Sequence, residues 1–459
     1  MSDSEYAGLS FGFLVSLMVP FMLVTLNYSM FSVVLPAVRD ETGILADTAA
    51  WLVTAHGLPY VVLMPLYGRL GDGMGKRRLL LGGISLFTLG TFLCLLGTSL
   101  PLLVVGRAVQ GIGAGGLNTL GFAIITERFP LAVRGKAVGT WMSVGPLASM
   151  LGPVIAGLLT VHVGWRSIYW PMLVLCISAL VIIRWRIPPL EAPERPRGFL
   201  RSFDWIGVAL LVLTVSFLVA YLSSRVLTGV SPLLDWRLLS GALLAGAGFV
   251  LWERRKRPPF IPLAIFRITT YNLGALAAGL RMYTVASISF LLPLFLTDVY
   301  GRGAGYVGTA MFLFALGFFF TLRAGGTLAD RWGTRWLVAA GAFTQILTIA
   351  FIVAVSGTAA AAWIVGAVVI NTTGAGVYMA ALDRYAMREV PRELIGGAAG
   401  LYSMLRFAGT LIGPVISGVI LYAGMEWLPT EVGAYRLSFS SLVVIQVAIV
   451  LVGLNLREG

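Results

Sequence analysis

Long runs of apolar residues follow one another along the whole chain, and short polar segments separate them. A helix needs about 20 mostly apolar residues to cross the hydrocarbon core of a bilayer. Fourteen runs reach or approach that length. They cover residues 11–38, 48–68, 79–97, 101–126, 137–161, 167–183, 205–224, 232–252, 271–297, 303–322, 336–356, 358–382, 394–423 and 437–456. The pattern therefore predicts an all-α membrane protein with fourteen transmembrane helices.

The composition supports lipid as the solvent for this chain. Of its 459 residues, 58% are hydrophobic and 12% are charged, and the mean hydropathy is +0.90. Soluble proteins carry about 25% charged residues. The net charge of +13 would indicate nucleic-acid binding in a soluble protein. In a membrane protein it more simply reflects topology, so we expect a lipid bilayer and no nucleic acid as partners.

The basic residues lie in alternate connections between the apolar runs. These basic connections cover residues 69–78, 128–136, 184–201, 254–267, 331–335 and 384–392. The intervening connections hold acids such as Asp40, Asp47 and Asp298 and few Lys or Arg. Because Lys and Arg accumulate on cytoplasmic loops, we expect a multi-pass protein of the cytoplasmic (inner) membrane with both termini in the cytoplasm.

Two motifs occur twice. Residues Gly68–Arg78 resemble Gly326–Trp336, at an offset of 258 residues, and Leu151–Gly157 resemble Ile412–Gly418, at an offset of 261. The copies lie eight helices apart, as expected for two six-helix halves with two helices inserted between them. The predicted divisions are an N-terminal six-helix bundle at 1–187, a linker with two inserted transmembrane helices at 188–267, and a C-terminal six-helix bundle at 268–459.

The order and spacing of these motifs resemble those of a known family. Gly68–Arg78 is similar to the loop signature of the major facilitator superfamily, and Leu103–Gly115 is similar to its helix-4 motif around Arg107. Gly164–Trp170 resembles the entry to helix 6. Five residues resemble the helix-5 antiporter motif: Gly145, Pro146, Gly152, Pro153 and Gly157. The likeness is to the fourteen-helix drug:proton antiporter branch. It implies the major facilitator fold, with multidrug efflux by proton-coupled export of amphipathic small molecules through alternating access.

One position departs from the family pattern. The family carries an aspartate in helix 1 about nine residues before a proline, and it is tied to cation recognition or proton coupling. Here the proline is Pro36 and Asn27 stands in place of the aspartate. The departure weakens the expectation that this residue carries a proton or recognises a cation.

The repeated loop predicts a conformational latch. A carboxylate such as Asp72 or Asp330 can cap a facing helix N-terminus, and the basic residues beside it can pair with an acid such as Glu127. The predicted latch residues are Gly68, Arg69, Asp72, Gly75, Arg77, Glu127, Asp330 and Arg331. The alternative is that these acids are solvated turn residues. For the helix-5 motif, we expect a proline bend and a close seam between bundles; ordinary packing of small residues is the alternative.

Charged and polar residues inside the runs mark a candidate cavity. Arg107, Arg281 and Arg406 lie within runs that hold no carboxylate at comparable depth, and intramembrane charges are costly. Unpaired arginines suit an anionic group, although pairing with backbone carbonyls is the alternative. His56 titrates near neutrality or is a core histidine. The predicted cavity residues are Asn27, His56, Arg107, Gln110, Arg281, Asn371, Tyr378 and Arg406.

The sequence contains no recognisable catalytic arrangement. It has two histidines, no metal-ligand cluster and no phosphate-binding loop, so we expect neither an enzyme, a cofactor nor a bound metal. The expected partners are a small-molecule substrate and protons, with a periplasmic adaptor protein as a further candidate. An exporter or flippase of an anionic lipid-like or organic-acid substrate is the second hypothesis. A membrane-embedded enzyme or a receptor is a remote third.

Overall fold

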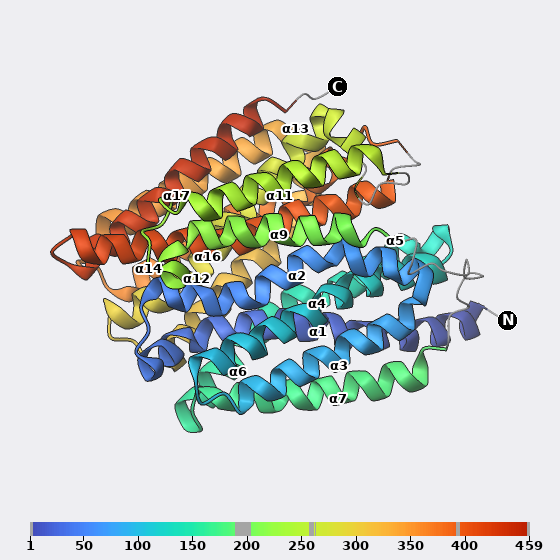
Figure 1. The fold of residues 1–459 in the computed structure, drawn as a ribbon, viewed down its shortest axis with the longest axis horizontal. Helices are drawn as coiled ribbons and strands as arrows, with labels where there is room; N and C mark the ends of the chain where they lie inside the picture. Colours follow the sequence, from blue (N-terminus) through green and yellow to red (C-terminus); the bar gives the residue numbers. More distant parts are fainter. Residues whose placement is uncertain (1–2, 189–202, 257–260, 262, 392–394, 457–459) are drawn as a thin grey trace. The chain divides into compact units, whose positions relative to one another are not determined.

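The computed structural model describes residues 3–188, 203–256, 261, 263–391 and 395–456 (Figure 1). Of residues 3–11, 72, 131, 132, 134–136, 322–324, 326, 327, 329, 330 and 395–397 it describes the backbone alone. Every regular element within these ranges is a helix, as the sequence predicts.

The helices follow the apolar runs closely. The first part of the chain holds α1 Asp3–Thr42, α2 Ala46–Met74, α3 Lys76–Leu95, α4 Leu100–Arg128, α5 Leu131–Met142, α6 Val144–His162, η1 Trp165–Ile168 and α7 Tyr169–Arg186. The second part holds α9 Trp205–Leu222, α10 Ser224–Thr228, α11 Trp236–Arg255, η2 Leu263–Arg267, α12 Thr269–Asp298, α13 Ala304–Val355, α14 Ala361–Val377, α15 Met379–Met387, α16 Ile395–Trp427 and α17 Glu431–Leu454.

Thirteen helical segments in the described ranges are long and apolar enough to cross a membrane. The fourteenth predicted span is α11, which has 20 residues and packs against α9. It is less apolar because Arg237 lies in its first turn and Glu253, Arg254 and Arg255 lie in its last. The structure thus agrees with a chain of 13 or 14 spanning helices.

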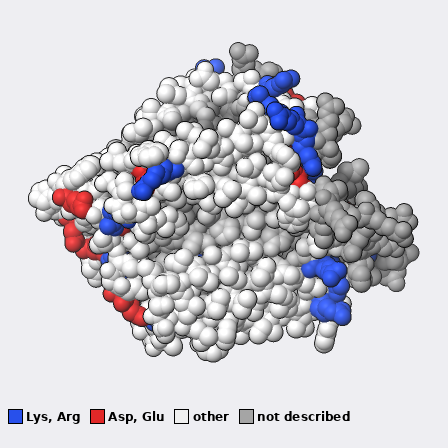
Figure 2. All heavy atoms as spheres, viewed as in Figure 1, with Lys and Arg blue, Asp and Glu red and all other residues white. Residues whose placement is uncertain are grey.

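The outer faces of the helices are apolar. Leu158, Val174, Leu244 and Val444 each expose more than half of their surface. On the face drawn in Figure 2, charged side chains lie near the ends of helices, and a broad surface between them carries other residues. Such a band is unstable in water but suits the hydrocarbon core of a bilayer.

The chain forms two compact units. The first contains residues 1–34 and 55–203, and the second contains residues 35–54 and 204–459. The end of α1 and the start of α2 therefore belong to the second unit, together with α9 and α11. The boundary at Phe203 lies within the predicted linker, and the three-part division stays a prediction.

The repeat is visible in the packing of α3 on α4 and of α13 on α14. A Cβ built on Gly83 is 3.0 Å from the carbonyl oxygen of Gly113, and one built on Gly341 is 2.8 Å from that of Gly374. The pairs occupy corresponding places, because Gly341 follows Gly83 by 258 residues and Gly374 follows Gly113 by 261. Each unit thus brings two helices together through paired glycines.

A second pair of equivalent contacts involves the helix-5 motif and its copy. A Cβ built on Gly152 would overlap the Oγ of Ser29, and one built on Gly413 is 2.9 Å from the Oγ of Ser287. Ser287 follows Ser29 by 258 residues. The same helix pair is therefore built twice, α6 on α1 in the first unit and α16 on α12 in the second.

The loop motif has the same backbone in both copies. Gly75 and Gly333 have φ values of 90° and 79°, a region that favours glycine because a Cβ would clash there. Gly75 lies between α2 and α3, and Gly333 interrupts the helical backbone of α13. The glycine lets one spanning helix end and the next begin within a few residues.

Candidate functional site

Arg107 is the centre of the polar core in the first unit. It lies on α4 and is 1% exposed. Its Nη1 donates to Oδ1 of Asn27 at 2.7 Å and to Oε1 of Gln110 at 3.1 Å. The guanidinium carbon lies 3.9 Å from the centre of the Phe31 ring. Three predicted site residues, Asn27, Arg107 and Gln110, are therefore in direct contact.

Asn27 explains why the departure from the family pattern matters. Its side-chain oxygen accepts a hydrogen bond from Arg107, so an aspartate of the same size there would form an ion pair. The amide instead supplies a neutral acceptor and leaves the positive charge uncompensated at that contact. Gln110 is held in turn by Thr91, whose Oγ1 lies 3.0 Å from Nε2 of Gln110.

His56 lies elsewhere in the first unit, on α2. Its side chain is 3% exposed, and its ring stacks on Tyr60 at 5.9 Å between ring centres. Its Nε2 has no hydrogen-bond partner among the described protein groups. Tyr60 accepts a hydrogen bond from Nδ2 of Asn118 at 3.0 Å. The geometry is compatible both with a packed core histidine and with a proton site.

Asn371 and Tyr378 belong to a hydrogen-bond network in the second unit. Tyr378 donates to Oε1 of Gln345 at 2.8 Å, and Nε2 of Gln345 lies 3.3 Å from Oδ1 of Asn371. Asn371 donates to Oγ1 of Thr348 at 2.9 Å. The members come from α13, α14 and the turn at Tyr378, and each finds partners within the network. Such bonds hold membrane helices together, which favours a structural role for these two predicted cavity residues.

Arg406 has a carboxylate partner, so our expectation of an arginine without one is wrong here. Its Nη1 lies 3.4 Å from Oδ2 of Asp383, and Tyr402 donates to the other oxygen of Asp383 at 2.6 Å. Asp383 lies on α15 and Arg406 on α16. The apolar-run pattern placed Asp383 at a span end, but helix packing brings the two side chains together.

Arg281, on α12, differs from the other two arginines. It is 1% exposed, and none of its three guanidinium nitrogens has a hydrogen-bond partner among the described protein groups. The guanidinium carbon lies 5.9 Å from the centre of the Phe318 ring. Tyr378, Tyr402, Asp383 and Arg406 interact with it electrostatically over longer distances. The second unit therefore buries a cation that its protein neighbours leave without hydrogen bonds.

The predicted latch is described only in part. Nζ of Lys76 lies 3.0 Å from Oε2 of Glu127, so the loop does contact the end of α4. Arg77 instead donates to the carbonyl oxygen of Arg184 at 2.7 Å. The side chains of Asp72 and Asp330 lie outside the described residues, so the latch stays a prediction. Arg331 is exposed.

The helix-5 motif coincides with a break and a close approach. The predicted span divides at Ser143 into α5 and α6, just before Pro146, which cannot donate a backbone hydrogen bond to the preceding turn. A Cβ on Gly145 is 3.1 Å from the Phe21 ring. Together with the contact at Gly152 given above, this shows that α6 approaches α1 closely within the first unit.

Sequence reasoning missed an ion pair in the second unit. Arg39 donates from Nη1 and Nη2 to the two carboxylate oxygens of Asp298, at 2.7 and 2.6 Å. Tyr435 donates to the same carboxylate at 2.5 Å, and Arg39 also reaches Asp40. The end of α1 is thereby held to α12 and α17.

A second missed ion pair holds the start of α2. Arg225, on α10 between α9 and α11, donates to both carboxylate oxygens of Asp47, from Nε at 2.7 Å and from Nη2 at 2.6 Å. Its guanidinium also lies 3.8 Å from the centre of the Tyr422 ring. These hydrogen bonds raise the pKa of Arg225. One signal in the sequence pointed here: Arg39 and Arg225 are arginines in connections otherwise poor in Lys and Arg.

Comparison with known proteins places the chain in a family. The model of the Major Facilitator Superfamily matches residues 17–414. The chain belongs to this superfamily. It is 29% identical to the multidrug resistance protein Stp of Mycobacterium tuberculosis (strain CDC 1551 / Oshkosh), over 88% of this chain and 74% of Stp. It is 26% identical to multidrug resistance protein 3 of Bacillus subtilis (strain 168), over 82% and 72% of the two chains.

The fold of this major facilitator protein agrees with that of solved members. The crystal structure of a D-xylose-proton symporter matches with a TM-score of 0.70 at 13% identity, over 98% of both chains. The predicted family and fold class are therefore confirmed. The protein is a multi-pass membrane transporter of small molecules with relatives named for multidrug resistance.

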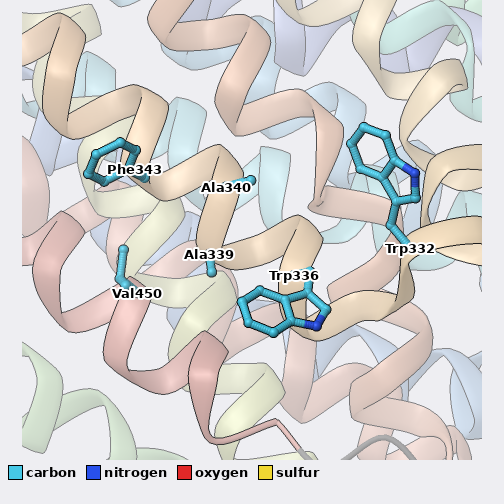
Figure 3. A pocket seen from close by; sticks show the side chains of 6 residues that line it. All are labelled: Trp332, Trp336, Ala339, Ala340, Phe343 and Val450. Carbon is cyan, nitrogen blue, oxygen red and sulfur yellow. The ribbon is translucent and has the colours of Figure 1, made fainter.

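A surface groove of this major facilitator protein is lined by none of the predicted cavity residues. It has a volume of about 570 Å³ and is lined by Trp332, Trp336, Ala339, Ala340, Phe343 and Val450 (Figure 3). Its three aromatic residues each expose more than half of their surface, and no polar surface lines it. Tryptophans are typical where helices meet the membrane–water interface, so a lipid-facing surface accounts for this groove.

Proposed function

We propose that this major facilitator protein exports amphipathic small molecules by alternating access, driven by the proton gradient. The observation that carries the proposal is the match over most of the chain to proteins named for multidrug resistance. Within each unit by itself, a buried arginine, Arg107 or Arg281, can fix the orientation of a bound molecule, and an aromatic neighbour, Phe31 or Phe318, can supply apolar contact.

The two ion pairs support alternating access. They hold residues 35–54 of α1 and α2 in the second compact unit, whereas the rest of both helices belongs to the first. Opening of this end requires that Arg39 release Asp298 and that Arg225 release Asp47. Pro36 and Pro59 lie within five residues of the points where α1 and α2 pass between units, and proline weakens a helix at such points.

We place the protein in the cytoplasmic membrane, with both termini in the cytoplasm. The basic connections then face inward, and the ion pairs of Arg39 and Arg225 lie at the outer ends of their helices. In this arrangement both ion pairs lie on the outer side of the membrane. A periplasmic adaptor stays a candidate partner, and a catalytic activity forms no part of the proposal.

Two residues are candidates to carry the coupling proton. His56 is a candidate because an imidazole can bind and release a proton and its Nε2 has no hydrogen-bond partner among the described protein groups. Asp383 pairs with Arg406 and accepts from Tyr402, so its protonation would weaken the pair and release the arginine. Since Asn27 cannot take up a proton, coupling in this protein has to use a group other than the helix-1 aspartate of the family.

A second candidate function is export of an anionic organic or lipid-like molecule. The observation that favours it is Arg281, which is buried without a hydrogen-bond partner among the described protein groups.

Proteoliposomes test the proposed function. Purified protein is reconstituted, a pH gradient is imposed, and accumulation of a panel of cationic, neutral and anionic amphipaths is measured with and without a protonophore. Accumulation that requires the gradient, accompanied by proton movement when the compound is added, supports the proposal. Equal fluxes with and without the gradient contradict proton coupling, and no flux above empty liposomes contradicts export.

A further inference from the structure

We propose that Arg281 is the binding site for a single negative charge, a carboxylate or a similar monoanionic group, on an amphipathic molecule that the protein transports. The inference rests on the proposed transport of small molecules and names the chemical class of one substrate group.

The first step is the contrast between Arg281 and the other arginines. Arg39, Arg225 and Arg406 have carboxylate partners, and Arg107 donates to two amide oxygens. Arg281 is as deeply buried as Arg107, but its Nε, Nη1 and Nη2 have no acceptor among the described protein groups. A buried cation without partners is strongly destabilising. A role in holding the fold together therefore does not explain the residue, and its hydrogen-bond partner has to come from outside the described protein groups.

The second step is the sign and size of the charge. Among the described groups that interact electrostatically with Arg281, the ionisable ones of opposite and like charge are Asp383 and Arg406. These two form an ion pair with each other, so their charges largely cancel. One positive charge remains, on Arg281. A ligand with one negative charge neutralises it, whereas a cationic ligand adds a second buried positive charge.

The third step is the surroundings. Phe318 lies 5.9 Å from the guanidinium carbon, and Tyr378 and Tyr402 are further aromatic side chains that interact with it. Both tyrosine hydroxyls already donate, to Gln345 and to Asp383. The guanidinium fork thus supplies the hydrogen bonds for an anion and can bind a carboxylate with two parallel bonds. The aromatic rings supply contact for an apolar body next to the charge.

The test uses two variants of Arg281 and a matched control. Arg281→Met removes the charge and keeps the length, whereas Arg281→Lys keeps the charge and loses the planar fork. Arg302→Met makes the same chemical change at an exposed arginine of the same unit. The probes are 1-naphthylacetate, its neutral amide, and 1-naphthylmethylammonium. Binding is measured by the shift in melting temperature of the full-length protein in detergent and by titration calorimetry.

We expect wild type and Arg302→Met to bind the carboxylate more tightly than the amide or the ammonium. Arg281→Met should lose about 10- to 100-fold in carboxylate affinity, the effect of removing hydrogen bonds to a charged group. Arg281→Lys should lose less. Without any probe, Arg281→Met should melt at the same or a higher temperature than wild type, because an unpaired buried charge is gone. A structural role predicts the opposite.

Other outcomes overturn the inference. If Arg281→Met binds the carboxylate as wild type does, or melts at a lower temperature without a probe, Arg281 is not an anion site. The inference also fails if wild type binds the neutral amide and the carboxylate with equal affinity. If phosphatidylglycerol, but not naphthylacetate, stabilises wild type and not Arg281→Met, the same site binds an anionic lipid headgroup. Binding is measured without a pH gradient, so a failure of proton coupling in the transport assay leaves this result unchanged. If the protein exports cationic probes alone, that result contradicts the anion site but not the proposed export of small molecules.

Discussion

Arg39 and Asp298 form an ion pair with two short hydrogen bonds, at 2.7 and 2.6 Å, although 259 residues separate them in the sequence. The two side chains are only 16% and 11% exposed, so water screens the interaction less than it does at the surface. The pair joins the end of α1 to α12. In the proposed mechanism it must form and break once in each transport cycle.

Asp298→Asn should shift the protein away from the described conformation. One of the two charge-assisted hydrogen bonds loses its acceptor, because an amide has a single oxygen, and the other loses its ionic character; a bond to a charged group contributes about 1.5–3 kcal/mol. We expect about a tenfold increase in the labelling rate of a cysteine placed at Ala46, with slower transport. Asp40→Asn is the matched control, because Asp40 bonds the same arginine but is 57% exposed. Equal labelling of both variants would show that the pair does not bias the conformation.

Arg225→Met should destabilise the contact between α10 and the start of α2. It leaves Asp47, which is 1% exposed in its side chain, without its ion-pair partner and removes the stacking on Tyr422. The expected loss is about 3 kcal/mol or more, as for other buried carboxylates left unpaired, observed as a lower melting temperature. Arg302→Met is the control, since it makes the same chemical change at an exposed arginine of the same unit. A melting temperature equal to that of the control would contradict the assignment.

Asn27→Asp should change the charge preference of transport. The new carboxylate lies where Oδ1 of Asn27 is 2.7 Å from Nη1 of Arg107, so it neutralises that cation. We expect transport of an anionic amphipath to fall and that of its cationic analogue to rise, measured as a ratio of initial rates in proteoliposomes. Asn118→Asp, which alters an amide bonded to Tyr60, is the comparison. An unchanged ratio in Asn27→Asp would mean that Arg107 does not contribute to substrate charge selection.

Gly413→Ala should destabilise the packing of α16 on α12. The added Cβ is 2.5 Å from the backbone oxygen of Tyr283, and a backbone atom cannot rotate away. Overpacking of this kind costs about 1–3 kcal/mol. In Gly366→Ala, a Cβ has no neighbour within 4 Å, and the substitution should stabilise α14 slightly. Melting temperatures that fall equally in both variants would argue against a close contact at Gly413.

The sequence predicts the helices well because lipid imposes one simple rule. Each span must be long and apolar, so a run of consecutive apolar residues is enough to locate it. The limit appears at α11, where Arg237 and Glu253 make a 20-residue helix less apolar than the others. The repeat was also predictable, and the corresponding contacts of Gly152 and Gly413 show it in three dimensions.

Side-chain partners across helices could not be predicted in the same way. Asp383 precedes Arg406 by 23 residues, and Arg225 follows Asp47 by 178. No local sequence pattern predicts these pairings, because the packing of the helices decides which side chains meet. The three intramembrane arginines look alike in the sequence, and the structure separates them into one with amide acceptors, one with a carboxylate, and Arg281.

A disulfide between positions 50 and 418 tests alternating access most directly. A Cβ on Gly418 is 2.9 Å from that of Ala50, close enough that a small relaxation permits a disulfide. The native Cys94 and Cys176 are buried. Ala50→Cys/Gly418→Cys should transport when reduced, lose transport when oxidised, and recover it in reductant, while each single variant is insensitive to oxidant. Undiminished transport by fully cross-linked protein would contradict the account, because the end held by Arg39 and Arg225 would not need to open.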